Sequence, residues 1–257
     1  MKIYVLVKEV PDTYGDRKLD LETGLADRAG DMVLDEITER ALEVALAYAD
    51  KNAGTEVIAL SMSPESATAS VRRALAIGAA SAVHVVDEEL RGADLTLTAE
   101  ALAAAIRRGE PDLVITGNLS TDGSGGVIPA MLAEHLGFAQ ATALSAVEIG
   151  ADQISGTRAA DAGNQEVTAS LPAVISITEA LPDARFPNFK GIMAAKKKPL
   201  EVLSLQDLGV SADPAAAPRA IMTTVAEKPP RAAGVKIVDE GDAGTQLAEF
   251  LVQNRLV

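Results

Sequence analysis

The sequence predicts an α/β protein with a doubly wound, mostly parallel sheet, followed by an extended C-terminal arm and a helix. Short apolar runs alternate with longer amphipathic segments as far as Gly137, a pattern typical of parallel strands joined by helices. After Ile192 the composition changes, and the segment SADPAAAPRA is rich in Pro and Ala. A segment of that kind cannot build a core of its own.

The elements of the first half follow in order from this alternation. KIYVLV, Lys2 to Val7, is a buried strand that ends before Pro11, and the polar segment Asp12 to Met32 is a loop or a small hairpin. From Asp35 the pattern DEITERALEVALAYAD is helical, with an apolar face at Ile37, Ala41, Leu42, Ala45 and Leu46. Further strands are expected at Glu56 to Ser61, Ala82 to Val86 and Leu113 to Thr116, and helices at Glu65 to Ile77, Asp94 to Arg108 and Val127 to Leu136.

The second half contains shorter strands, which we interpret as additions to the edge of the sheet. They are expected at Ala146 to Ile149, Gln153 to Arg158, Gln165 to Ser170 and, as a buried run, Ala173 to Ile177. An amphipathic stretch from Ala243 to Leu251 predicts a last helix. The chain therefore divides into an α/β domain over residues 1–210 and an arm over residues 211–257, which is either disordered or lies across a partner.

Composition excludes several classes of function. The chain has 257 residues, a formal net charge of -14, two histidines and no cysteine. The acidic balance argues against nucleic-acid binding, and the lack of cysteine excludes disulfides and thiolate-bound metals. No apolar run is long enough to cross a bilayer, and no signal peptide precedes the first strand. We expect a cytoplasmic protein that does not insert into membranes and has no metal site.

The segment GNLSTDGSGGVIPA, Gly117 to Ala130, is the strongest candidate for a binding loop. It follows a predicted strand and precedes a predicted helix, and ligands of doubly wound sheets bind at the carboxyl ends of strands. Glycines 123, 125 and 126 let backbone N–H groups approach an anion, while Thr121 and Ser124 offer hydroxyls. Asp122 beside a phosphate is unusual, so it accepts from a ribose hydroxyl or caps the loop. The alternative is a plain βα turn.

Other polar residues allow two readings each. Lys8 is either a cation at the ligand-bearing edge or a solvated lysine, and Met62 and Ser63 either contact a bound ring or begin a helix. His84 and His135 have no partners in view, which favours packing or surface roles. The run Lys196 to Lys198 is a solvated face or a basic patch for an acidic partner. No catalytic motif is present.

Several motifs together resemble one family, the beta subunit of electron-transfer flavoprotein. The resemblance covers essentially the whole chain in the right order, and ARFPNFKGIMAAKKK is its most specific part. The motifs are VKEVPD near the N-terminus, ALAIGAASAVHV at 74–85, the Gly117 to Ala130 loop, GTRAADAGNQEV at 156–167, LPAVISIT at 171–178 and DARFPNFKGIMAAKKKPLEV at 183–202.

The resemblance implies an electron carrier rather than an enzyme. Members form a heterodimer with an alpha subunit that holds most of an FAD, and electrons pass from flavin dehydrogenases, such as acyl-CoA dehydrogenases, to a quinone oxidoreductase. The beta subunit has an adenine-nucleotide-binding type of fold and buries a structural AMP. On this basis residues 1–210 are the nucleotide-binding domain and residues 211–257 wrap the alpha subunit.

The resemblance also implies site residues. The loop Gly117 to Val127 would wrap the phosphate, although members commonly carry acidic residues and TGQ where this chain has STDGSGGV. The expected AMP contacts are Leu6, Lys8, Asp35, Glu36, Ile37, Thr38, Met62, Gly117, Asn118, Thr121, Asp122, Gly123, Ser124, Gly125, Gly126 and Val127.

Partner contacts are implied in the same way. The position at which members dock a Leu into a dehydrogenase is Phe189 here, with Ile192 and Met193 beside it. Two positions near the flavin ring, often aromatic in the family, fall at Thr13 and Ile37, and Tyr14 is a candidate substitute.

Three alternatives stay open. In a bifurcating form of the same family a second FAD replaces AMP and NADH is the donor. A stand-alone adenine-nucleotide sensor of the universal-stress type shares the coarse βα pattern but needs neither the RFPNFKGIM segment nor the arm. An ATP-cleaving enzyme would require a phosphate loop that this chain lacks.

Overall fold

A computed structural model describes residues 1–15 and 17–257 of the chain and confirms the α/β, doubly wound architecture. By its contacts the chain separates into two units, Met1–Thr224 and Val225–Val257. The larger unit contains the sheet, and the smaller contains the last helix. The wrapping of a partner by residues 211–257 stays a prediction.

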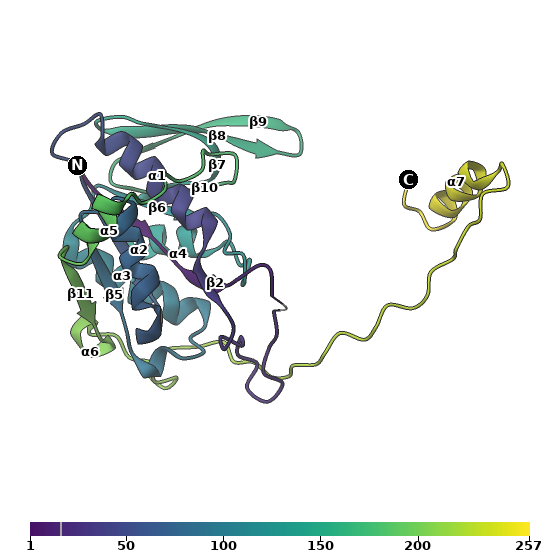
Figure 1. Ribbon diagram of the computed structural model, residues 1–257, viewed down its shortest axis with the longest axis horizontal. Helices are drawn as coiled ribbons and strands as arrows, with labels where there is room; N and C mark the ends of the chain where they lie inside the picture. The colour runs from purple at the N-terminus through teal and green to yellow at the C-terminus, as the bar shows by residue number, and fades with distance from the viewer. Residues whose placement is uncertain (16) are drawn as a thin grey trace. The chain divides into compact units, whose positions relative to one another are not determined.

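The main sheet has nine strands in the order β11-β5-β4-β1-β6-β10-β7-β8-β9 (Figure 1). Strands from β11 to β7 pair in parallel, whereas β8 and β9 pair antiparallel. The strands are β1 Lys2–Leu6, β4 Glu56–Met62, β5 Ser81–Val85, β6 Leu113–Gly117, β7 Ala139–Ile149, β8 Gln153–Ala160, β9 Gly163–Ser170, β10 Ala173–Ile177 and β11 Leu200–Leu203.

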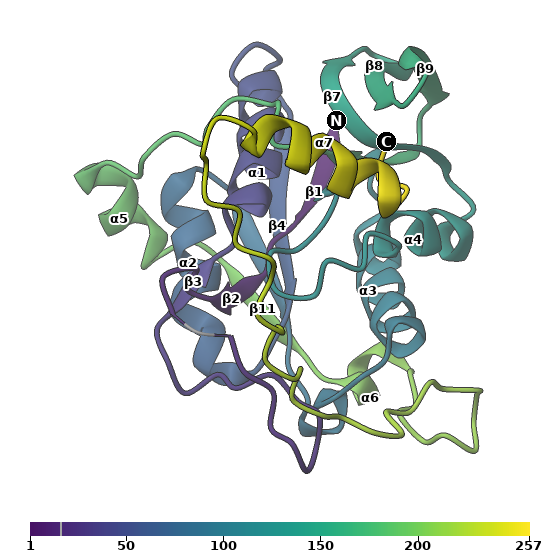
Figure 2. The same ribbon diagram turned by 90° about the vertical axis from the view of Figure 1, so that its right-hand side faces the viewer.

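Helices cover both faces of this sheet, as Figure 2 shows. On one face α1 (Glu36–Ala49) and α2 (Thr68–Ile77, after a 3-10 turn at Glu65–Ala67) bury Leu42, Leu75 and other apolar side chains against the strands. On the other face α3 (Leu95–Gly109) and α4 (Ile128–Leu136) bury Ile106 and Leu132. The short helices α5 (Phe189–Ala195) and α6 (Leu205–Leu208) lie against α2 and α3. Apolar burial on both faces stabilises the sheet.

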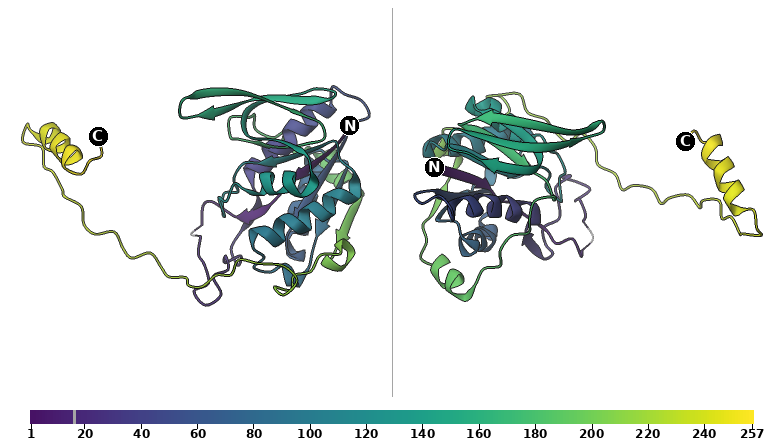
Figure 3. Two further views of the ribbon diagram at one scale, coloured as in Figure 1. Left: turned by 180° about the vertical axis from the view of Figure 1, so that it is seen from behind. Right: turned by 90° about the horizontal axis from the view of Figure 1, so that it is seen from above.

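The second half differs from the predicted edge strands. β10 lies between β6 and β7, wholly buried, instead of at the edge, and β7 begins at Ala139 rather than Ala146. The run AQATALS that opens β7 is small and polar, so its strand character comes from pairing with β10 and not from hydropathy. The hairpin of β8 and β9 extends the sheet beyond β7 (Figure 3).

Two further strand pairings were not expected. β2 (Glu9–Pro11) and β3 (Met32–Leu34) form a separate two-stranded antiparallel sheet, so the polar segment after Pro11 connects the two strands of a hairpin. β11 pairs with β5 at the edge of the main sheet, although its residues follow the change in composition after Ile192. Only the two leucines of LEVL are sheltered, while Glu201 and Val202 are exposed, so its signal in the sequence is weak.

Residues 211–224 of the predicted arm lie against the start of α3. The Arg219 guanidinium donates to Glu100 Oε2 at 2.8 Å, and the Ala220 amide donates to Asp94 Oδ2 at 2.6 Å. The second unit, Val225–Val257, contains α7 (Ala243–Gln253), which confirms the predicted last helix. None of its residues is buried, and Leu247 and Phe250 are exposed.

Candidate functional site

The carboxyl ends of β1, β4 and β6 lie side by side, because these three strands are parallel neighbours. Lys8 follows β1, and the glycine-rich loop follows β6. The two meet: Lys8 Nζ lies 2.7 Å from Asp122 Oδ1 and 3.3 Å from Ser120 Oγ. Lys8 is therefore an ion-paired residue at the edge where doubly wound sheets bind ligands, and not a freely solvated lysine.

Asp122, the one acidic residue in the sequence of the loop, has a side chain that is 12% exposed. Its Oδ2 lies 3.8 Å from the Arg28 guanidinium, and its Oδ1 also accepts from the Gly123 amide at 2.6 Å. Burial opposes ionisation of this carboxyl, but the hydrogen bond and the charge of Lys8 outweigh burial and hold its pKa below the ordinary value. Asp122 is thus a carboxylate at neutral pH.

Asp35 comes directly before α1 and lies almost wholly inside the protein, 1% exposed. Its Oδ2 accepts from the Thr121 amide at 2.9 Å, whereas its Oδ1 is buried with no partner among the described residues. Burial raises the pKa of this carboxyl, although the Thr121 hydrogen bond partly offsets that effect. A buried acceptor without a donor is costly unless a ligand supplies the donor, and a nucleoside hydroxyl or amine would do so.

The end of the glycine-rich loop has unpaired backbone donors. The amide N–H groups of Gly125, Gly126 and Val127 make no hydrogen bond to any residue that the structure describes, and α4 begins immediately after them. Gly126 has φ of +68°, and a Cβ there would lie 2.7 Å from Leu119 Cδ2, so glycine is required. Free amides at a helix N-terminus fit an anion such as a phosphate.

The loop also approaches α1 closely. Ile37, buried at the first turn of α1, packs on Gly117, where an added Cβ would lie 2.8 Å from two carbons of that side chain. Thr38 is buried and donates its hydroxyl to the Asp35 carbonyl at 2.7 Å. Glycine at 117 thus lets the loop and the start of α1 share one site.

The remaining predicted residues occupy the same edge with fewer contacts. Leu6 and Met62 are half-buried ends of β1 and β4, and Glu36 is exposed. The Asn118 amide donates to the Ile177 carbonyl at 2.9 Å. The Ser124 hydroxyl donates to the Ser120 carbonyl. The backbone carbonyl of Thr121 accepts from the Arg17 guanidinium.

His84 takes part in a buried polar cluster next to this edge. Its Nε2 lies 2.9 Å from Ser63 Oγ, which in turn lies 3.0 Å from Ser61 Oγ. Burial lowers the pKa of His84, so the ring is neutral at physiological pH. The packing interpretation fits this environment.

Large apolar side chains gather on the exposed side of the predicted docking segment. Phe186 and Phe189 are 89% and 79% exposed, and Ile192 and Met193 are about half exposed at 46% and 48%. An exposed apolar group of this kind is typical of a protein–protein contact. Phe186 was not among the predicted docking residues, although it precedes Pro187 in the same motif.

The scaffold holds this segment firmly. Arg185 pairs with Glu43 Oε1 at 2.8 Å and with Asp50 Oδ2 at 2.9 Å, both on or next to α1. Asn188 caps α5 by accepting from the Gly191 amide at 2.8 Å. A Cβ at Gly191 would lie 2.6 Å from the Ala76 carbonyl oxygen, so α5 rests directly on the backbone of α2.

Gly191→Ala is expected to lift α5 from α2, because the methyl group would overlap a backbone carbonyl. The free energy of unfolding should fall by about 1–3 kcal/mol, the usual cost of overpacking. Chemical denaturation would measure this, with Lys190→Ala, an exposed neighbour, as the matched control. Equal stability of the two variants would contradict the close packing of α5 on α2.

The three lysines of the run Lys196 to Lys198 lie in two different environments. Lys196 and Lys197 are exposed, but Lys198 Nζ donates to the carbonyl oxygens of Leu75 at 2.9 Å, Gly78 at 3.3 Å and Ala79 at 2.6 Å. These are the last carbonyls of α2 and its closing turn, which a cation satisfies. The readings of the run as a solvated face or a basic patch are therefore wrong for Lys198.

Lys198→Met should destabilise the fold by about 1.5–3 kcal/mol, since it removes charge-assisted hydrogen bonds and leaves carbonyls unpaired. Lys197→Met, the same substitution at an exposed position, should change stability by less than about 0.5 kcal/mol. Thermal or urea unfolding of both variants would measure the difference. Similar losses would contradict the capping role.

The two positions expected near a flavin ring, Thr13 and Ile37, and the candidate substitute Tyr14 lie in different environments. Thr13 is exposed in the connection between β2 and β3. Ile37 is buried under Gly117 at 3% exposure and presents no surface to a partner. Tyr14, in the connection between β2 and β3, is fully exposed. Tyr14 is therefore the aromatic side chain of this region that an approaching subunit would meet.

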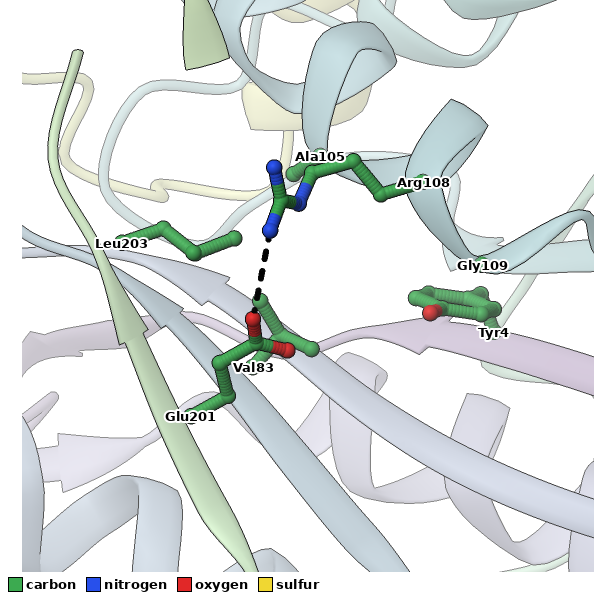
Figure 4. A pocket seen from close by; sticks show the side chains of 7 residues that line it. All are labelled: Tyr4, Val83, Ala105, Arg108, Gly109, Glu201 and Leu203. Carbon is green, nitrogen blue, oxygen red and sulfur yellow. Dashed lines mark ion pairs between the residues drawn. The ribbon is translucent and has the colours of Figure 1, made fainter. Parts of the chain in front are cut away.

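A separate groove of about 380 Å³ lies between the end of α3 and strands β1, β5 and β11 (Figure 4). It contains an ion pair of 3.5 Å between Arg108 and Glu201. None of the predicted site residues lines it; the lining residues are Tyr4, Val83, Ala105, Arg108, Gly109, Glu201 and Leu203.

Residues 1–15 and 17–257 form neither a metal site of clustered acidic and histidine side chains nor a membrane-spanning helix. No three His, Asp or Glu side chains of this part gather in a way that could hold a metal ion. No helix in it combines the length and the apolar character needed to cross a membrane.

Sequence reasoning missed several residues of the site. Ser120 and Arg28 complete the surroundings of Lys8 and Asp122, and Arg17 holds the Thr121 carbonyl. The two arginines lie in the polar segment 12–32, which has no periodicity that would place them. The pairing of Lys8 with Asp122 had a usable signal, since opposite charges follow two strands of one parallel sheet.

Comparison with known proteins adds independent information. A family model described as electron transfer flavoprotein domain matches residues 23–208. The electron transfer flavoprotein subunit beta of Mycobacterium tuberculosis is 46% identical over 263 residues, covering 99% of both chains. The subunit of the same name from Syntrophomonas wolfei is 34% identical, covering 98% and 96%. The caffeyl-CoA reductase-Etf complex subunit CarD of Acetobacterium woodii is 33% identical, covering 82% and 81%.

Proposed function

The chain belongs to the electron-transfer flavoprotein family, as a beta-type subunit, and we propose that it binds AMP and supports an FAD held by an alpha subunit. In this role it docks flavin dehydrogenases, such as acyl-CoA dehydrogenases, so that electrons pass through the flavin to a quinone oxidoreductase. It is an electron-carrier subunit rather than an enzyme in its own right. We place it in the cytoplasm. Family membership replaces the hypothesis of a stand-alone nucleotide sensor.

One observation supports the nucleotide assignment. Within the part of the chain that the structure describes, a buried carboxylate oxygen without a donor and backbone amides without acceptors lie at the same carboxyl edge of the sheet. Among the described residues, Asp35 Oδ1 has no donor and the amides of Gly125 to Val127 have no acceptors. A nucleoside monophosphate offers hydroxyls and an amine to the first and a phosphate to the second. The sequence carries no catalytic motif, and we infer a structural role for the nucleotide.

Partner contacts use other parts of the chain. The exposed apolar side chains of α5 provide a docking surface for dehydrogenases, and Tyr14 faces the alpha-subunit flavin. The flavin supplies the redox chemistry when bound, while this chain positions it and excludes water around it. The residues from 211 onward wrap the alpha subunit.

One observation supports the alternative within the family, the bifurcating form. The relative from Acetobacterium woodii is named as a subunit of a caffeyl-CoA reductase complex, so a chain of this kind can serve a complex other than a simple carrier. In the alternative form a second FAD replaces AMP and NADH is the electron donor. The same edge of the sheet would hold the adenosine and phosphate portions of that FAD.

The test is reduction of the complex formed with its alpha subunit. An acyl-CoA dehydrogenase with its substrate should bleach the flavin absorbance, and NADH alone should not. Bleaching by NADH would favour the second form. A complex purified without flavin, or with flavin that no dehydrogenase reduces, would contradict the proposed function.

A further inference from the structure

We propose that Asp122 limits the phosphate charge of the nucleotide, so that the site accepts a nucleoside monophosphate or a dinucleotide and rejects ADP and ATP. This proposal rests on the nucleotide site proposed above and assigns its specificity to one side chain. It is carried by the arrangement of charges around the glycine-rich loop.

The three cationic side chains at this edge, Lys8, Arg28 and Arg17, already contact acidic or carbonyl groups of the protein. Lys8 Nζ lies 2.7 Å from Asp122 Oδ1, and the Arg28 guanidinium lies 3.8 Å from Asp122 Oδ2. Arg17 donates to the Thr121 carbonyl. A phosphate that enters the loop therefore meets cations whose charge Asp122 has already partly neutralised.

A second carboxylate lies beneath the same loop. Asp35 Oδ2 accepts from the Thr121 amide, one residue before Asp122. Burial raises the pKa of Asp35, and the nearby charge of Asp122 acts in the same direction. Lys8 and Arg28 both face Asp122, and Asp35 adds a second carboxyl, so the three cations leave about one net positive charge for a ligand.

The free donors of the loop can serve a modest anion. The amides of Gly125, Gly126 and Val127 and the N-terminus of α4 suit the charge of about -1.5 to -2 that a phosphate monoester carries at neutral pH. Each further phosphoryl group adds negative charge near the two carboxylates. At the effective dielectric of a partly buried site, one like charge at this range weakens binding by about tenfold or more.

The chemistry explains why a structural site would contain an acidic residue. A loop built only from amides and cations would bind the triphosphate more tightly than the monophosphate. Asp122 reverses that order without touching the ribose or the base. The diester pyrophosphate of a flavin dinucleotide carries about the same charge as AMP, so the repulsion from Asp122 does not exclude it from the site.

The experiment compares AMP, ADP and ATP on the heterodimer after removal of its bound nucleotide, by calorimetric titration in EDTA. The wild-type complex should bind AMP at least about tenfold more tightly than ATP. Asp122→Asn should remove most of this difference by strengthening ATP binding. Asp161→Asn, the same change at an exposed turn between β8 and β9, should leave the difference unchanged.

A measurement on the wild-type complex tests the same proposal even if the Asp122→Asn variant folds poorly. Raising the salt concentration screens charge repulsion, so the ratio of ATP to AMP dissociation constants should shrink. Equal affinity of wild type for AMP and ATP would overturn the charge limit but leave the nucleotide site intact. A preference that is unaffected by both salt and Asp122→Asn would assign the selection to shape. Binding of no adenine nucleotide would overturn the proposed function as well.

Discussion

Removal of residues 225–257 is expected to abolish association with the alpha subunit while leaving the α/β unit folded. The unit Met1–Thr224 keeps the sheet, both cores and the contacts of Arg219 and Ala220 with α3. The removed unit carries α7, whose Leu247 and Phe250 are exposed and three residues apart, on one face of the helix. Apolar anchors of this kind commonly contribute about 2 kcal/mol each to an interface.

Co-purification and size-exclusion chromatography would measure the association, and circular dichroism would confirm the fold of the shortened chain. Substitution of Leu247 and Phe250 by Asp should reproduce the loss without shortening the chain. Glu249→Ala, on the same helix, should leave association unchanged. A shortened chain that still forms the heterodimer would show that the wrapping role is wrong.

Phe189→Ala is expected to weaken electron transfer from the dehydrogenase by about 30-fold in kcat/KM, mainly through KM. The Phe189 ring is 79% exposed in the isolated chain, so its loss removes no core packing. Truncation of a buried aromatic anchor in an interface costs about 2 kcal/mol or more, which corresponds to that factor. Flavin reduction at varied concentrations of the carrier would measure kcat and KM.

Two controls make the Phe189 result specific. Phe186→Ala removes the same ring three residues earlier and should have a smaller effect if docking depends on the family's anchor position. The FAD content should stay unchanged in both variants, because the FAD is proposed to be held by the alpha subunit, whereas Phe189 begins α5, which packs on α2. Loss of FAD from Phe189→Ala would refute the anchor role.

The sequence predicted the parallel half of the fold well because each of its strands is an apolar run flanked by helices. The strands β1, β4, β5 and β6 came within one or two residues of their observed bounds. The start of β7 was missed because pairing with β10 makes a strand of small and polar residues. The central position of β10 was missed because chain order does not fix strand order in a sheet.

The candidate site was likewise predicted only in part from the sequence. The carboxyl-edge rule placed Lys8 and the glycine-rich loop together, and the structure adds the ion pair between Lys8 and Asp122. The orphaned Oδ1 of Asp35 could not be predicted, since it depends on the depth at which the loop covers α1. The role of Lys198 was also hidden, because exposed and capping lysines look alike in a run of three.

The proposed docking surface and the proposed nucleotide site occupy different parts of the unit Met1–Thr224. The glycine-rich loop follows β6 and contacts α1 and β1, whereas α5 lies on α2. This separation fits a nucleotide that stabilises the scaffold and takes no part in electron transfer. Changes in the loop should therefore alter nucleotide content before they alter dehydrogenase docking.

The most direct measurement is the identity of the nucleotides released by denaturing the purified heterodimer, separated by chromatography and weighed by mass spectrometry. The account predicts FAD and AMP in equal amounts, with no ADP or ATP. FAD in twofold amount over the heterodimer without AMP would establish the second form of the carrier. A heterodimer that contains FAD in equal amount and no further adenine nucleotide would contradict the assignment of the edge formed by Lys8, Asp35 and the glycine-rich loop as a nucleotide site.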